Sequence, residues 1–171
     1  MVTAVMVVLG LISDTHDNVE AIRRAVEVFN DRGVEAVLHA GDYNAPFTAE
    51  AFKGLKAKLL GVYGNVDGER IGLKERYSKV LDAEILGDFG DLEFGGYRVA
   101  LIHGVVQPVV EALALSGKYR VVVRGHLHKA ETTKIGEALV INPGEACGYL
   151  TGKKTIAILD LEKLEVEYVE L

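Results

Sequence analysis

Short apolar runs alternate with longer polar intervals through the first three quarters of the chain. Runs of this length that are rich in Val, Ile and Leu are typical of buried strands, and the intervals are long enough for helices. Because strands joined by a crossover helix pair in parallel, the pattern predicts a mainly parallel sheet in this part. The predicted strands cover residues 5–12, 36–39, 58–63, 97–102, 119–123 and 138–141.

Helical signals lie in four of the polar intervals. The clearest begins at residues 17–20, which have the spacing of a capping box with Asp17 as the cap. Apolar side chains then recur on one helical face until Gly33, which supplies a stop. Weaker patterns predict helices after Pro46, after Asp67 and over residues 108–115.

The last part of the chain has a different pattern. Turn residues at 95–96, 136–137 and 160–163 separate short apolar runs without intervals of helix length, which favours antiparallel hairpins. We find no linker, repeat or low-complexity tract. The sequence therefore predicts one mixed α/β domain over residues 1–171, with two sheets flanked by helices.

The N-terminal segment of residues 2–12 is almost entirely apolar. It is too short to cross a bilayer, has no basic segment before it, and is followed at once by polar residues 13–18. We therefore interpret it as a buried first strand and expect no association with a membrane. Met6 is an alternative start, which would make residues 1–5 a non-structural extension.

Charge and cysteine content restrict the partners and the compartment. The chain has 19 Lys and Arg against 25 Asp and Glu, a net charge of −6, and no basic run, so we expect no stable complex with nucleic acid. The single cysteine, Cys147, cannot form an internal disulfide. This is compatible with a cytoplasmic location and with an inert thiol.

Polar side chains follow five of the predicted strands at the point where each strand ends. Taken singly, each has an ordinary explanation as a turn former, a helix-entry residue or a buried polar tip. Together they indicate a metal site, because ligands bind at the carboxyl edge of parallel strands and turn chemistry would use Ser and Pro as readily as His. These candidate ligands are Asp14, His16, Asp42, Asn65, His103, His126 and His128.

The composition of this ligand set indicates the type of site. Seven oxygen and nitrogen ligands without a thiolate are too many for one tetrahedral zinc ion, but they suit two divalent ions that share a carboxylate. Such a pair clamps both oxygens of an in-line displacement at phosphorus. Imidazole and carboxylate ligands favour Mn, with Ni, Fe, Zn or Mg as alternatives.

Five short blocks resemble the signature of the calcineurin-like metallophosphoesterases, and in particular the small single-domain phosphodiesterases of bacteria and archaea. The resemblance covers most of the chain and implies a four-layer αββα sandwich. The blocks are Asp14-x-His16, Gly41-Asp42, Gly64-Asn65, His103-Gly104 and Gly125-His126-x-His128.

The resemblance also implies the roles of the site residues. Asp42 would bridge the two metals, and a hydroxide between them would attack phosphorus in line. The catalytic residues would be Asp42, Asn65 and His103. The first metal would take Asp14, His16 and His128, and the second Asn65, His103 and His126.

The sequence departs from the family pattern at two places. Larger members have a histidine proton donor directly after the Asn, where this chain has Val66 followed by Asp67. Asp67 is open to two interpretations, a group that orients the site or donates a proton, and an N-cap for the next helix. Residues 142–147 form the second departure, because related enzymes usually have Ser where this chain has Glu145.

Two further polar residues lie near the predicted site. We interpret His39 as a packed strand histidine rather than as a support for a ligand. We expect Arg124 to be exposed or in a surface ion pair rather than to contact phosphate.

The predicted function is hydrolysis of a small phosphodiester by a protein that is a candidate homo-oligomer. Diesters are expected to be preferred over monoesters, because the sequence has no clear cluster of extra cations near the site for a third free oxygen. The alternatives are a phosphomonoesterase or nuclease on the same site, and a non-catalytic scaffold with this fold.

Overall fold

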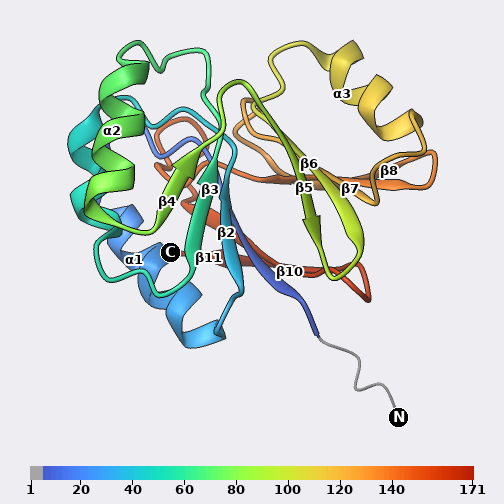
Figure 1. Cartoon of the computed structure of the whole chain (residues 1–171), viewed down its shortest axis with the longest axis horizontal. Helices are drawn as coiled ribbons and strands as arrows, with labels where there is room; N and C mark the ends of the chain where they lie inside the picture. Colours follow the sequence, from blue (N-terminus) through green and yellow to red (C-terminus); the bar gives the residue numbers. More distant parts are fainter. Residues whose placement is uncertain (1–5) are drawn as a thin grey trace.

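Two β-sheets pack face to face, with helices on the outer face of each (Figure 1). The computed structural model describes residues 6–171. The suggested extension of residues 1–5, and with it the start of the first predicted strand, lies outside the described residues.

The first sheet contains six strands in the order β11-β10-β1-β2-β3-β4. The four strands from β1 to β4 are parallel, whereas β10 is antiparallel to β1 and β11 is antiparallel to β10. The bounds are β1 Val8–Ile12, β2 Ala36–His39, β3 Lys58–Gly61, β4 Ala83–Ile85, β10 Thr155–Asp160 and β11 Glu165–Glu170.

The second sheet contains five strands in the order β5-β6-β7-β9-β8. Its three central strands are parallel, and each edge strand forms an antiparallel hairpin with its neighbour. The bounds are β5 Phe89–Phe94, β6 Tyr97–Ile102, β7 Val121–Val123, β8 Ala130–Ile135 and β9 Ala138–Pro143. The hairpins predicted from the turns near residues 95, 136 and 160 are all present.

The helices lie where the sequence predicts them, with two differences in detail. The cap of α1 is Asn18, whose side chain accepts a hydrogen bond from the Ala21 N–H at 3.1 Å, because Asp17 is used instead to bind the Ala45 N–H. The segment after Pro46 forms a 3-10 helix, η1, rather than an α-helix. The bounds are α1 Val19–Arg32, η1 Pro46–Phe52, α2 Arg70–Val80 and α3 Gln107–Leu115.

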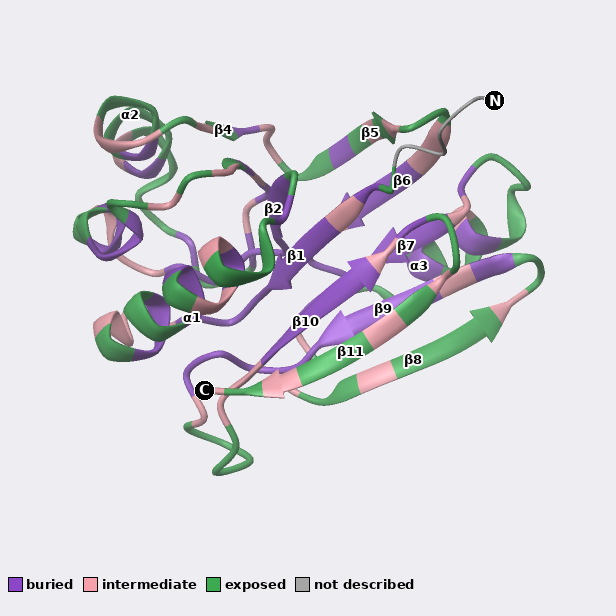
Figure 2. Ribbon diagram, turned by 90° about the horizontal axis from the view of Figure 1, so that it is seen from below, coloured by how far each residue is buried: buried purple, intermediate pink, exposed green. Residues whose placement is uncertain are grey.

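Three apolar cores separate these elements into four layers. Alternate side chains of β1 show how this works, since Leu9 and Leu11 contact the second sheet while Ile12 packs under α1. The middle core is therefore made by both sheets, and α3 closes a third core on the outer face of the second sheet. Figure 2 shows the central strands of both sheets buried and the edge strands β8 and β11 largely exposed. The predicted four-layer αββα sandwich is confirmed.

Strand ends differ from the predictions by a few residues, and β4 was not predicted. This strand has three residues, of which only Ile85 is buried, so it lacks an apolar run. It belongs to the sheet because its backbone pairs with β3, with Gly61 opposite Ile85.

Gly10 generates a prediction about the packing of α1 on the first sheet. A Cβ atom at this position would lie 2.6 Å from the ring of the fully buried Phe29. Gly10→Ala should therefore lower the free energy of unfolding by about 1–3 kcal/mol, measured by urea denaturation. Gly68→Ala is the control, because a Cβ there meets nothing within 4 Å. Equal midpoints for the two variants would contradict this account.

Candidate metal centre

The polar residues that follow the parallel strands meet at one edge of the molecule, where the two sheets lie against each other. The His103 Nδ1–H donates to the carbonyl oxygen of Ala40 at 2.7 Å, and the His126 N–H donates to Asp14 Oδ2 at 3.1 Å. Each of these bonds joins a loop of the first sheet to a loop of the second. The site is therefore built between the sheets.

One cluster of side chains forms around Asp14. The His128 Nε2 atom lies 3.4 Å from Asp14 Oδ1, and His16 Nε2 lies 3.7 Å from the same oxygen. His16 Nε2 is also 3.7 Å from Asp42 Oδ2. These spacings leave room for a cation among groups that all carry lone pairs or negative charge.

A second cluster forms on the other side of Asp42. His103 Nε2 lies 3.3 Å from Asp42 Oδ2, the same oxygen that faces His16. The Asn65 Oδ1 atom is 2.9 Å from His103 Nε2 and 3.0 Å from His126 Nδ1. All seven predicted ligands are thus brought together, in two groups that share the Asp42 carboxylate.

Hydrogen bonds favour Nδ1 as a protonated nitrogen in three histidines. Nδ1 of His103 faces the Ala40 carbonyl oxygen, Nδ1 of His128 faces the Glu145 carboxylate at 2.7 Å, and Nδ1 of His16 faces Asn44 Oδ1 at 3.2 Å. Because these partners are acceptors, Nδ1 of each ring is assigned as a donor, which leaves Nε2 as the nitrogen that would bind a metal. A metal-binding histidine commonly donates its other ring N–H in this way.

Two buried atoms in the first cluster lack hydrogen-bond partners among the described residues. They are Asp14 Oδ1 and His16 Nε2, which face each other. A buried polar atom without a partner costs about 1–3 kcal/mol, so such atoms need an explanation. A divalent cation provides one, and the oxygen and nitrogen donor set fits it.

The charge state of Asp42 suits a cation ligand. Burial raises the pKa of this carboxyl, but the His103 side chain and the Val66 N–H, which donates to Oδ1 at 3.1 Å, more than offset it. The net effect holds the pKa of Asp42 below its ordinary value. The carboxylate is therefore ionised at neutral pH.

Five of the seven candidate ligands have left-handed backbone conformations. The φ angles are 53° at Asp14, 37° at His16, 60° at Asp42, 70° at His126 and 56° at His128. Each such angle costs a residue with a Cβ about 1 kcal/mol or more. Backbone strain of this kind is concentrated at functional sites, which supports a role for these residues beyond turn formation.

Glycines allow two of the loops to touch. A Cβ on Gly41 would lie 2.7 Å from the Gly64 nitrogen, and a Cβ on Gly64 would lie 1.9 Å from Asp42 Oδ1. Neither position has room for a larger side chain. The glycines predicted to let the backbone crowd the site therefore do so, and they bring Asp42 and Asn65 together.

Asp67 orients the site rather than capping a helix. Its Oδ1 accepts from the N–H groups of Tyr43 and Asn44 at 2.8 and 2.9 Å, and its Oδ2 from those of Gly64 and Asp42 at 2.7 and 3.0 Å. The α2 cap is Glu69, so the N-cap interpretation is wrong. Burial raises the pKa of Asp67 and the Gly64 and Asn44 N–H groups oppose it. With both oxygens accepting hydrogen bonds, Asp67 is badly placed to donate a proton.

Glu145 is a site residue that the sequence did not reveal. Besides His128, its buried carboxylate binds the Leu150 N–H at 3.1 Å, the Thr151 N–H and the Thr151 hydroxyl at 2.6 Å. Burial opposes ionisation, but these donors lower the pKa of Glu145 to about 2. The only signal in the sequence was a carboxylate directly after a glycine in the loop that departs from the family pattern.

Cys147 lies closer to the site than expected. Its Sγ lies within 4.8 Å of ring nitrogens of His16 and His128, and it donates to Glu145 Oε2 at 3.4 Å. Burial raises the pKa of the thiol to about 12. The sulfur is therefore a protonated hydrogen-bond donor, consistent with the inert thiol predicted from the sequence.

The two remaining polar residues are both buried. His39 packs on the Tyr43 ring at 3.7 Å between centroids and accepts the Gly41 N–H, as expected for a strand histidine. Arg124 is 4% exposed, so the prediction of an exposed residue or surface ion pair is wrong. Its guanidinium binds the Gly104 and Gly125 carbonyl oxygens and the Gln107 side chain.

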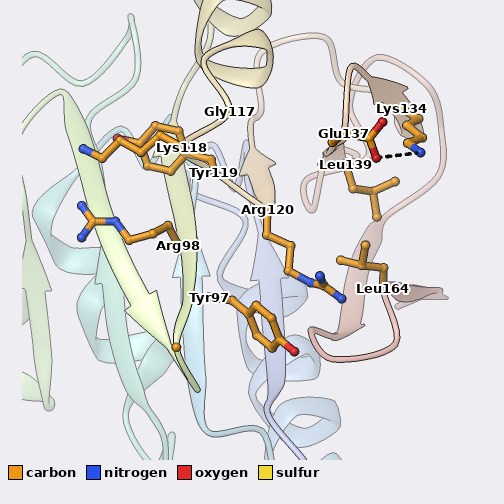
Figure 3. A pocket seen from close by; sticks show the side chains of 11 residues that line it. Tyr97, Arg98, Gly117, Lys118, Tyr119, Arg120, Lys134, Glu137, Leu139 and Leu164 are labelled. Atoms are coloured by element: carbon orange, nitrogen blue, oxygen red, sulfur yellow. Dashed lines mark ion pairs between the residues drawn. The ribbon is translucent and has the colours of Figure 1, made fainter.

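A cavity of about 550 Å³ lies at the opposite end of the second sheet, where strands β6 and β7 begin (Figure 3). Its wall includes Tyr97, which is six residues before His103 along an extended strand and so about 20 Å away. Its charged groups have partners, since Arg98 and Lys118 bind Asp91 and the Arg120 guanidinium lies 4.2 Å from the Tyr97 ring centroid. This cavity takes no part in the site.

The fold and the arrangement of acidic, amide and imidazole side chains define a class of metal-dependent phosphoesterase. Residues 7–164 match the calcineurin-like phosphoesterase superfamily domain, and the chain belongs to that superfamily. The family predicted from the sequence motifs is thereby confirmed. Among residues 6–171, no helix is long and apolar enough to cross a membrane.

Two archaeal proteins and one solved structure are similar over nearly the whole chain. Phosphodiesterase MJ0936 of Methanocaldococcus jannaschii is 44% identical over 95% of this chain and 98% of its own. A probable metallophosphoesterase of Methanothermobacter thermautotrophicus is 31% identical over 94% of this chain and 91% of its own. The structure of an archaeal phosphodiesterase has a TM-score of 0.91 at 44% identity, and the match covers 96% of this chain and 99% of that one.

The contacts of Asp67 generate a second prediction. Asp67→Asn replaces an acceptor of backbone N–H groups with an amide NH₂, so it should lower the free energy of unfolding by about 1–3 kcal/mol. Hydrolysis should slow by a similar factor for all phosphoesters in a series of graded leaving-group acidity. Urea denaturation and steady-state rates measure the two effects. Asp31→Asn, on the exposed surface of α1, is the control. A rate loss confined to poor leaving groups would instead identify Asp67 as a proton donor.

Proposed function

We propose that this protein is a metal-dependent phosphodiesterase that uses two divalent ions. The observation that carries the proposal is the position of Asp42 Oδ2, which lies 3.7 Å from His16 Nε2 and 3.3 Å from His103 Nε2. One carboxylate oxygen thus belongs to both clusters. The similarity to Phosphodiesterase MJ0936 over 95% of the chain supports the same activity.

The ligands divide between the two ions as the clusters divide. Asp14, His16 and His128 would hold one ion, Asn65, His103 and His126 the other, and Asp42 would bind both. When bound, two divalent ions supply positive charge to the phosphoryl oxygens and acidify a water molecule, so that a nucleophile is available at neutral pH.

The residues of the chain hold this arrangement in place before substrate arrives. Hydrogen bonds to Ala40, Asn44 and Glu145 orient three of the imidazoles, so little reorganisation is needed when a charged transition state forms. At the position after Asn65, the Val66 side chain cannot donate a proton. The rate should therefore depend on how well the leaving group carries its own charge.

The surroundings of the site favour a diester over a monoester. A monoester dianion has a third free oxygen that requires a cation or donor of its own. Of the two nearby arginines, Arg124 is bound to main-chain oxygens and Arg70 pairs with Asp88 at 2.8 Å. Competent residues at all seven ligand positions also argue against a non-catalytic scaffold.

The proposal also includes the identity of the metal, the cellular location, the size of the substrate and the oligomeric state. Mn is favoured as the metal because the ligands are imidazole, amide and carboxylate groups. A cytoplasmic location is supported by the single buried thiol, and a small phosphodiester substrate by the absence of basic runs in the sequence. A homo-oligomer stays a prediction.

Removing the shared ligand tests the proposal directly. Asp42→Ala should lower diester hydrolysis by roughly 10³-fold or more and reduce bound Mn to less than one ion per chain, because both ions lose a ligand. His128→Ala should retain one ion, since it changes one cluster only. Elemental analysis of the purified proteins and steady-state rates after metal removal and re-addition measure these effects. Two bound ions and a near-normal rate in Asp42→Ala would refute the shared-ligand assignment.

Glu145 generates a further prediction about metal affinity. Glu145→Gln keeps the size of the side chain but removes the charge that holds the His128 Nδ1 proton, so Mn affinity should fall about 10- to 100-fold. Competition with a chelator of known affinity measures the change. Glu137→Gln is the matched control, because that side chain is 97% exposed and distant from the site. Equal affinities for both variants would show that Glu145 only stabilises its loop.

A further inference from the structure

A cavity of about 310 Å³ opens directly beside the second cluster. Two of the candidate metal ligands, Asn65 and His103, also line this cavity, so the cavity adjoins the metal centre. The other side of the wall is formed by Val105, Val106 and Val109, from the segment between β6 and α3 and from α3 itself. We call this cavity the valine pocket.

The three valines of the valine pocket are exposed to solvent and belong to none of the apolar cores. Val105, Val106 and Val109 are 51%, 55% and 44% exposed, and all three line the pocket that Asn65 and His103 also line. Isolated exposed apolar residues are ordinary, but a group of them that lines a pocket beside a candidate metal centre is a candidate ligand-binding surface.

Val106 occupies a position where a valine lowers stability. It is the N-cap residue of α3, and its side chain makes no capping hydrogen bond. Ser, Thr, Asp or Asn at an N-cap stabilises a helix by about 1 kcal/mol relative to an apolar residue. The chain therefore keeps an exposed apolar side chain where a polar one would make α3 more stable.

The remaining wall restricts the shape of the occupant. Tyr63 also lines the pocket, with its hydroxyl donating to the Arg70 carbonyl at 2.7 Å and the Arg70 guanidinium 4.8 Å from its ring centroid. Arg70 pairs with Asp88 at 2.8 Å, and both residues also line the pocket, so its lining combines apolar side chains with an ion pair. Its volume is at the lower limit for ligand pockets, which suits one ring system rather than a long chain.

We propose that the valine pocket holds an aromatic ester group of the phosphodiester substrate and that Val106 and Val109 select for it. The inference rests on the proposed function, since the phosphate would lie at the adjoining metal centre. It adds a substrate class, the aryl or nucleobase-bearing diesters.

The test compares two methyl phosphodiesters whose second alcohols have matched acidity, one an aryl and the other a compact fluoroalkyl group. With the Mn-loaded protein, the aryl ester should have a KM about tenfold lower, because only the ring fills the apolar wall. Val106→Ser and Val109→Thr should each raise the KM of the aryl ester about three- to tenfold. They should leave its kcat and the KM of the fluoroalkyl ester unchanged within about twofold.

Leu115→Ser is the matched control, because Leu115 is an exposed apolar residue at the other end of α3 and lies outside the pocket. It should keep the wild-type ratio of KM values. Val106→Ser should also raise the melting temperature or leave it unchanged, since serine is a good N-cap.

Three outcomes would overturn the inference. Equal KM values for the two diesters in the wild type, or variants that change both KM values together, would refute selection by the pocket while the proposed function holds. A change of molecular mass by light scattering in Val106→Ser, with an unchanged KM ratio, would assign the valines to a contact between copies of the chain. If neither diester is hydrolysed, the proposed function and the inference fail together.

Discussion

The candidate metal centre depends on a constraint on the backbone, which has to turn sharply after each strand. Side chains from neighbouring parallel strands start about 4.8 Å apart, and they converge on one point only if the chain turns sharply as each strand ends. The left-handed angles at Asp14, His16 and Asp42 make these turns. Hydrogen bonds between the loops hold the strained conformation, among them Asp14 N–H to the Gly41 oxygen at 3.0 Å and His16 N–H to the Asp42 oxygen at 3.1 Å.

A small number of buried acceptors keep this arrangement rigid. The Asp67 carboxylate binds backbone N–H groups from two loops, and the Glu145 carboxylate binds a histidine and its own loop at once. In both cases the carboxylate oxygens accept hydrogen bonds from protein groups. Rigidity in the surrounding residues is what allows a metal site to keep its geometry without reorganisation.

The sequence predicted the family, most of the strands and a set of seven candidate ligands that the fold brings together, because each depends on a local pattern. Apolar runs such as that of β2 and the blocks around Asp42 and His128 are visible without any knowledge of distant contacts. The sequence was insufficient where a distant partner decides the outcome. Arg124 looked exposed because two of its partners, the Gly104 carbonyl oxygen and the Gln107 side chain, lie about 20 residues earlier in the chain. In the same way, β4 is a strand only because β3 lies beside it. No role could be assigned to Glu145, because that role is a hydrogen bond to His128, which lies 17 residues earlier in the chain.

The order of strands in the first sheet has a consequence for the newly made chain. The strand β1, which presents Asp14, lies between β2 and β10, and Val8 pairs with Asp160 near the other end of the sequence. A ribosome releases Asp14 and His16 long before residues 155–160 exist to complete the sheet around them. Pairing over such a separation is also slow, because loop closure is entropically costly. All seven candidate ligands therefore emerge before the first sheet is complete.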